Sequence, residues 1–170
     1  IPGGRVEGLR LPLSGTYGNG TLAIGRRCAA IAFEGLSYAA LELGRESITV
    51  CPDSARAMLV YDRALRLSLA AEDLALAGTL GGARLRLEAA RAGLASEGFA
   101  VDDARIVLGE DEAAIRLSAA TLTGEITGGL SGRFAGGAAG LDAVPLDLAA
   151  LSGDWRYEDD MLRIERGGFL

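Results

Sequence analysis

The chain has 170 residues and a formal net charge of −6, with 49% apolar and 24% charged residues, which argues against an unstructured chain and against nucleic acid as a partner. It contains no His, so the commonest general base, the commonest metal ligand and any Ser-His or Cys-His pair are excluded. No apolar run approaches the roughly 18 residues that a membrane-spanning helix needs.

Short strands with one apolar face are predicted from the start of the chain. Leu9, Leu11 and Leu13 alternate with Arg10 and Pro12, and this period of two indicates a strand with one buried side. Asn19-Gly20 then has the composition of a two-residue type I′ hairpin turn. The chain opens with Ile1-Pro2 rather than Met, and we expect it to be a segment of a longer polypeptide.

Two cysteines lie next to strand-like apolar runs. Cys28 begins one such run and Cys51 ends another, and their spacing is far too wide for a CxxC redox pair. We predict that they form a disulfide, which would stabilise the fold by about 3 kcal/mol through loop entropy and would indicate an oxidising compartment. The alternative is a pair of unrelated buried thiols.

Alternation continues through the rest of the chain, with Leu, Ile or Trp on one side of each run and mainly charged residues on the other. The runs are centred on Leu41/Leu43, Leu65/Leu67/Leu69, Leu85/Leu87, Ile106/Leu108, Ile115/Leu117, Leu146/Leu148, Trp155/Tyr157 and Leu162/Ile164. Gly81-Gly82, Gly128-Gly129 and Gly136-Gly137 are expected to break the chain between strands. The pattern predicts an all-β fold, a curved antiparallel sheet that either stays open as a groove or closes to a sandwich.

Helical alternatives remain at two places. Residues 61–78 carry Leu65, Leu69 and Asp73 at helical spacing, although strands fit Arg66 and Ser68 better. Residues 87–98 are rich in Ala, Glu, Arg and Leu, and a short helix there stays open.

Catalytic and cofactor motifs are missing from the sequence. The glycine-rich stretch at 124–140 has no P-loop pattern, and no GxSxG motif is present. The acidic clusters Asp102-Asp103, 110–112 and 158–160 are expected at solvated turn tips. We therefore predict no enzyme activity, no catalytic residue, no metal and no cofactor.

Several short segments that combine a predicted strand and turn resemble a known protein family. The stretches 76–87, 119–136, 144–148, 153–157 and 161–164, together with the opening 8–15 and the Cys28/Cys51 pair, resemble the YdbH branch of the AsmA/TamB-like proteins. This resemblance implies a single β-rich segment, residues 1–170, of a long periplasmic protein that is anchored in the inner membrane. It also implies a hydrophobic β-groove that carries phospholipids between the inner and outer membranes, through which the protein contributes to outer-membrane biogenesis.

The predicted function is lipid transport, with phospholipid acyl chains lying along the aliphatic face and both membranes contacted by parts outside this chain. The candidate lipid-binding residues are Leu65, Leu67, Leu85, Leu87, Ile106, Leu108, Ile115, Leu117, Leu146 and Leu148. The alternatives are a structural or adhesive β-domain with a closed core and no ligand, and an enzyme domain completed by residues elsewhere in the polypeptide.

Overall fold

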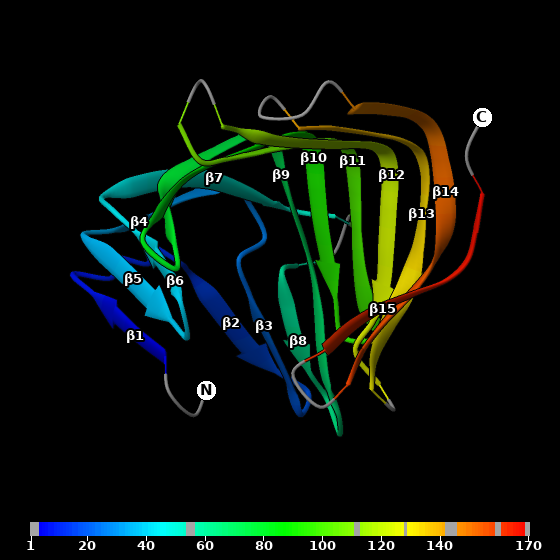
Figure 1. Cartoon of the computed structure of the whole chain (residues 1–170). Coiled ribbons are helices and arrows are strands. Elements are labelled where there is room, and N and C mark those ends of the chain that lie inside the picture. Colours follow the sequence, from blue (N-terminus) through cyan, green and yellow to red (C-terminus); the bar gives the residue numbers. More distant parts are fainter. Residues whose placement is uncertain are drawn as a thin grey trace.

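The computed structural model of the chain is all β (Figure 1). It describes residues 4–53, 57–110, 113–127, 129–141, 146–158 and 161–168, and the side chains of Leu146 and Leu162 lie outside this description. Residues 61–78 and 87–98 form strands wherever they have regular structure, so neither helical alternative is adopted. None of the described residues forms a helix long and apolar enough to cross a bilayer.

The strands are short in the first third of the chain and long afterwards. The short strands are β1 (Gly4–Glu7), β2 (Gly15–Gly18), β3 (Thr21–Ile24), β4 (Ala29–Phe33), β5 (Gly35–Tyr38), β6 (Leu41–Leu43), β7 (Glu46–Pro52) and β8 (Leu59–Tyr61). The long strands are β9 (Leu65–Leu80), β10 (Ala83–Ala95), β11 (Gly98–Leu108), β12 (Ile115–Glu125), β13 (Leu130–Leu141), β14 (Leu146–Glu158) and β15 (Met161–Gly168). The expectation of short strands throughout is therefore wrong for this second group.

All fifteen strands belong to one antiparallel sheet, and this confirms the predicted fold class. Strands β9 to β15 form a meander in which each pairs with its neighbour in the chain. The opposite edge of β9 pairs in succession with β8, β7 and β6, from which three branches continue: β8–β3–β2, β7–β4 and β6–β5–β1. Among the described residues, β1 and β15 end the main strand order and do not pair with each other, so the sheet stays open.

The structure places the turn pairs predicted from the sequence in different positions. Asn19-Gly20 joins β2 to β3, and both residues have the positive φ of a type I′ turn, as predicted. Gly81-Gly82 joins β9 to β10 between strands, as predicted, and both residues have positive φ as well. Gly136 and Gly137, by contrast, lie inside β13 rather than between strands. Gly128 lies outside the described residues.

In every long strand from β9 to β14, the alternation of inward- and outward-facing side chains is interrupted once. The inward-facing side chains follow each other at every second residue, except for one step of three: Ala71 to Leu74, Ala89 to Ala92, Val101 to Ala104, Ala119 to Leu122, Phe134 to Gly137 and Leu148 to Leu151. The pairing register aligns the steps of β9 to β13 into one row across the sheet, and the step of β14 lies next to this row; we call the whole the crease.

Backbone geometry at the crease explains the extra residue. Asp73, Asp103, Gly136 and Ala150 have positive φ and lie between the two inward-facing residues of the step on β9, β11, β13 and β14. The pairing of β13 with β14 also shifts register there, as at a β-bulge, and Figure 1 shows β12, β13 and β14 turning sharply between their two halves. The crease therefore folds the sheet into a deep concave shape. Asp102-Asp103 lie on its outer side within β11, so their expected place at a turn tip is wrong.

The core lies where the N-terminal branches cover β9. Val50, Met58 and Ala71 are buried together, and Leu13, Ala29, Ile31, Ile48 and Leu69 pack against them. Cys28, next to β4, is joined to Cys51 in β7, which confirms the predicted disulfide. The N-terminal strands thus fill the β9 side of the concave face and leave its other side to the long strands.

Candidate functional site

The aliphatic residues of the meander come together on the concave face because the strands pair in register. Leu87, Ile106 and Leu117 are cross-strand neighbours, and the same row continues through Ala139 to Leu148. Leu85, Leu108, Ile115 and Leu141 form a parallel row nearer the strand ends. Cross-strand partners in an antiparallel sheet share a face, so both rows point inward.

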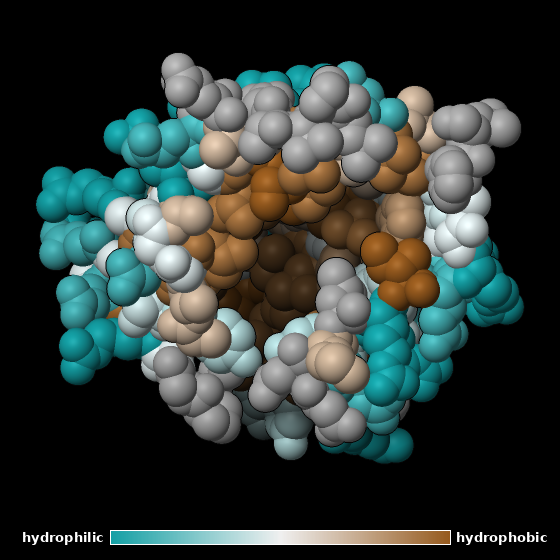
Figure 2. Space-filling model, viewed as in Figure 1, coloured by the Kyte–Doolittle hydropathy of each residue, from teal (hydrophilic) through white to brown (hydrophobic). Residues whose placement is uncertain are grey.

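An apolar cavity of about 830 Å³ lies on this face, between β11 and β15. Its lining includes residues from five consecutive strands: Phe99, Ala104, Ile106, Leu117, Ala119, Leu122, Phe134, Gly137, Ala139, Leu148, Leu151, Trp155 and Ile164. Figure 2 shows an apolar hollow, surrounded by more hydrophilic outer surface, that is open toward the viewer. Its volume is within the range of pockets that take small-molecule ligands.

The candidate residues are divided between the cavity and the surrounding face. Ile106, Leu117 and Leu148 line the cavity. Leu85, Leu87, Leu108 and Ile115 lie on the same face but outside the cavity. Leu65 and Leu67 lie on β9, where Leu65 is 59% exposed and Leu67 is half-buried. The side chain of Leu146 lies outside the described residues.

Aromatic side chains complete the cavity wall and were not among the candidates. Phe99 and Trp155 have ring centroids 6.0 Å apart, and the Trp155 Nε1 donates a hydrogen bond to the Thr123 carbonyl oxygen at 3.1 Å. Both rings cover Gly124: a Cβ there would lie 2.3 Å from Phe99 and 2.9 Å from Trp155. Glycine at this position thus lets the two rings lie against the sheet.

Beyond the crease, an ionic cluster occupies the outer face behind Trp155. Asp154 accepts a hydrogen bond from Arg133 Nε at 3.0 Å, and Arg166 pairs with its other carboxylate oxygen. The hydrogen bond from Arg133 and the charge of Arg166 hold the pKa of Asp154 below its usual value, against a smaller opposing effect of desolvation. Among the described residues, by contrast, those that line the cavity include no charged side chain.

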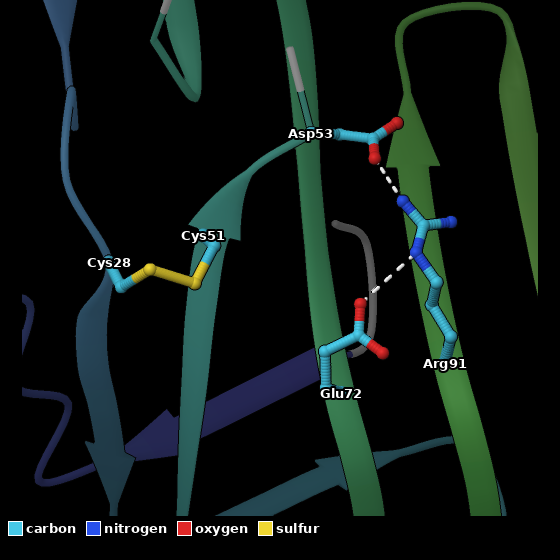
Figure 3. Close-up of polar contacts among 5 residues, drawn as sticks. All are labelled: Cys28, Cys51, Asp53, Glu72 and Arg91. Carbon is cyan, nitrogen blue, oxygen red and sulfur yellow. Dashed lines mark hydrogen bonds and ion pairs between the residues drawn. A yellow bond between two sulfur atoms is a disulfide. The ribbon is translucent and has the colours of Figure 1, made fainter. Parts of the chain in front are cut away.

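A second ionic cluster ties an N-terminal branch to the meander (Figure 3). Arg91 on β10 pairs with Glu72 on β9 at 3.2 Å and with Asp53, which follows β7. Cys51, two residues before Asp53, carries the disulfide to Cys28. The two links hold β4 and β7 against the central strands at the level of the crease.

Within the described ranges, no group of three or more Cys, Asp or Glu side chains is arranged to hold a metal ion. Comparison of the chain with protein-family models, with curated proteins and with solved structures found no match.

Proposed function

We propose that this chain is a segment of a YdbH-like member of the AsmA/TamB-like proteins, and that its concave face carries phospholipid acyl chains in the periplasm. The observation that carries the proposal is the open cavity of about 830 Å³ with a wall of Ile, Leu, Ala and aromatic side chains. The disulfide is consistent with an oxidising compartment such as the periplasm.

The energetics of such a site need no polar recognition. Each buried CH₂ of an acyl chain contributes about 0.8 kcal/mol, so a chain is held by contact with the wall alone. Since Leu117 in the wall is 44% exposed, the free protein leaves apolar surface uncovered. The lipid head group would stay at the open, wet side, and transfer would proceed by sliding without a covalent step.

Replacement of Leu117 by Asp tests this proposal. A carboxylate in contact with an acyl chain is desolvated, so we expect binding to fall about tenfold or more. The measurement is native mass spectrometry of phospholipid retained after gentle purification, supported by photocrosslinking with a lipid that carries a diazirine in its acyl chain. The half-exposed side chain of Leu117 allows the variant to fold.

The matched control is Val107→Asp. Val107 lies on the outer face of β11, directly across from Arg86 and Arg116, so a carboxylate is well placed there. Val107→Asp should keep the lipid. Repeated absence of phospholipid from the unsubstituted protein, or retention by a folded Leu117→Asp variant, would contradict the proposal.

A further inference from the structure

The space enclosed by the concave face, which we call the trough, is filled by the protein itself on the β9 side. Ala71, the crease residue of β9, is 5% exposed, and Val50 and Met58 pack with it. The partly buried residues around these three are also apolar, and the described residues include no buried polar or charged side chain. This side of the trough therefore offers a ligand neither free space nor a polar partner.

The crease gives the trough its long axis. The sheet bends sharply there, so its inner surface runs straight along the crease and not along the strands (Figure 1). At the crease, the cavity is lined by Ala104, Ala119, Gly137 and Leu151, on β11, β12, β13 and β14. An extended acyl chain is straight, and it contacts both halves of the folded sheet when it lies along the crease, at right angles to the strands.

The extent of the cavity along this axis suits one acyl chain. Five consecutive strands line the cavity, and the four spacings between them, about 4.8 Å each, span about 19 Å. An acyl chain in a bilayer covers one leaflet, which is about half of the roughly 30 Å hydrocarbon core. One chain thus fits along the crease between β11 and β15.

Building on the function proposed above, we propose that a bound phospholipid lies along the crease with the methyl end of its acyl chain at β11 and its head group toward β15. A phosphate at the filled side would lose its water without gaining a partner, whereas a terminal methyl group is well placed there. The direction follows from the filled side alone, so it holds whether or not the sheet continues past β15. Lipid then enters and leaves the trough on the β15 side.

Two single-tryptophan variants test this direction. Trp155, the only tryptophan of the chain, is replaced by Phe, and a new tryptophan is introduced as Ile106→Trp or as Leu148→Trp. The two positions are matched, because both are half-buried and line the cavity in the same cross-strand row, on β11 and β14. Three strand spacings, about 14 Å, separate them.

The probe is phosphatidylcholine in vesicles, brominated either near the methyl end or near the carboxyl end of one acyl chain. Bromine quenches tryptophan fluorescence only at short range. Because the two positions are about 14 Å apart, we expect methyl-end bromines to quench the Ile106→Trp variant at least about twofold more than carboxyl-end bromines do. The Leu148→Trp variant should show the opposite preference.

Each other outcome is distinct. The same preference in both variants would show that the chain does not lie along the crease, and exchanged preferences would show the reverse direction. Either result overturns the proposed orientation and leaves the lipid site in place. No quenching in either variant, together with no phospholipid in the native mass spectrum of the unsubstituted protein, would remove the proposed function as well.

Photocrosslinking of the unsubstituted protein gives the same answer if a tryptophan variant does not fold. A diazirine at the methyl end of the acyl chain should label β11, and one next to the carboxyl group should label β14 or β15. Labelling in the reverse order, or of the same strands by both probes, would overturn the proposed orientation.

Discussion

Trp155 and Asp154 are neighbours in β14, and the alternation of the strand places one on the apolar inner face and the other on the charged outer face. Trp155 faces the cavity and lies against Gly124, while Asp154 faces outward and holds Arg133 and Arg166. One residue thus contributes to the wall of the cavity, and the one before it links β13, β14 and β15 on the opposite side. The outer ionic cluster supports the strands that carry the aromatic wall.

Replacement of Asp154 by Asn should make stability less dependent on acid. Because the folded state lowers the pKa of Asp154, its carboxylate stabilises the fold above the unfolded pKa, and this stabilisation is lost as pH falls through the folded value. The variant should be less stable than the parent near pH 7, and the difference should shrink below the usual aspartate range. Thermal unfolding between pH 7 and 3 measures this, with Asp147→Asn on the same strand as control. A difference that is constant with pH would contradict it.

At the scale of elements, the crease decides the shape of the meander. At the bends of β9 and β11, Asp73 and Asp103 adopt the left-handed region. Asp tolerates this conformation better than most residues do, whereas a β-branched side chain resists it. The same step allows Ala89 and Ala104 to be buried on the inner side of the bend.

Substitution at Asp103 should separate backbone strain from side-chain contacts. Asp103→Val should destabilise the fold by about 1–2 kcal/mol, whereas Asp103→Gly should be neutral or slightly stabilising. Urea unfolding measures both. Arg105→Val, outward on the same strand with ordinary extended backbone, is the control and should change little. Equal effects of Val at 103 and 105 would argue against strain at the crease.

Most of the strands could be predicted from the sequence, because the alternation of apolar and polar residues shows which face of the sheet each residue occupies. The strands, the hairpin turns at Asn19-Gly20 and Gly81-Gly82, and the disulfide follow from local chemistry. The crease was missed because a three-residue step resembles a strand break or one turn of a helix. The helical alternative over 61–78 rested instead on the spacing of Leu65, Leu69 and Asp73. The sequence signal of the crease is the change of phase between Leu69 and Leu74.

The cavity wall was predicted in part for the same reason. Ile106, Leu117 and Leu148 lie on one side of the crease, in phase with the alternation that was counted. Leu122 and Phe134 lie beyond the step, where the phase is shifted, whereas Trp155 belongs to a counted run but was not chosen as a wall residue. Leu65 and Leu67 were placed with the others because one sequence cannot reveal that long-range pairing assigns the β9 side to the N-terminal branches.

At the scale of the whole molecule, the disulfide links two strands of an N-terminal branch. Cys28 and Cys51 join β4 to β7, and the backbone pairing of β7 with β9 is a short ladder at Cys51 and Pro52. The meander from β9 to β15 is held by its own continuous pairing. The two parts therefore differ in how much they depend on the covalent bond.

The double variant Cys28→Ser, Cys51→Ser should lose about 3 kcal/mol of stability, and the loss should be local. Hydrogen exchange should become faster in β4 and β7, while β11, β12 and β13 keep their protection. Adding reductant to the parent should reproduce this pattern and should leave the double variant unchanged. Uniform loss of protection over the meander would show that the disulfide supports the whole sheet instead.

Because the strands of the meander pair only with strands adjacent in the chain, further strands could be added without disturbing the pairing. From β10 to β14 each strand contacts the strand before it and the strand after it, so no strand depends on a distant segment of sequence. Duplication of one hairpin that keeps its three-residue step would insert two strands and continue the crease, lengthening the trough by roughly 10 Å without any change of pairing elsewhere. Gene duplication of a hairpin is thus a conservative route by which such a trough grows, and the same unit serves an engineer who wants a longer or shorter one.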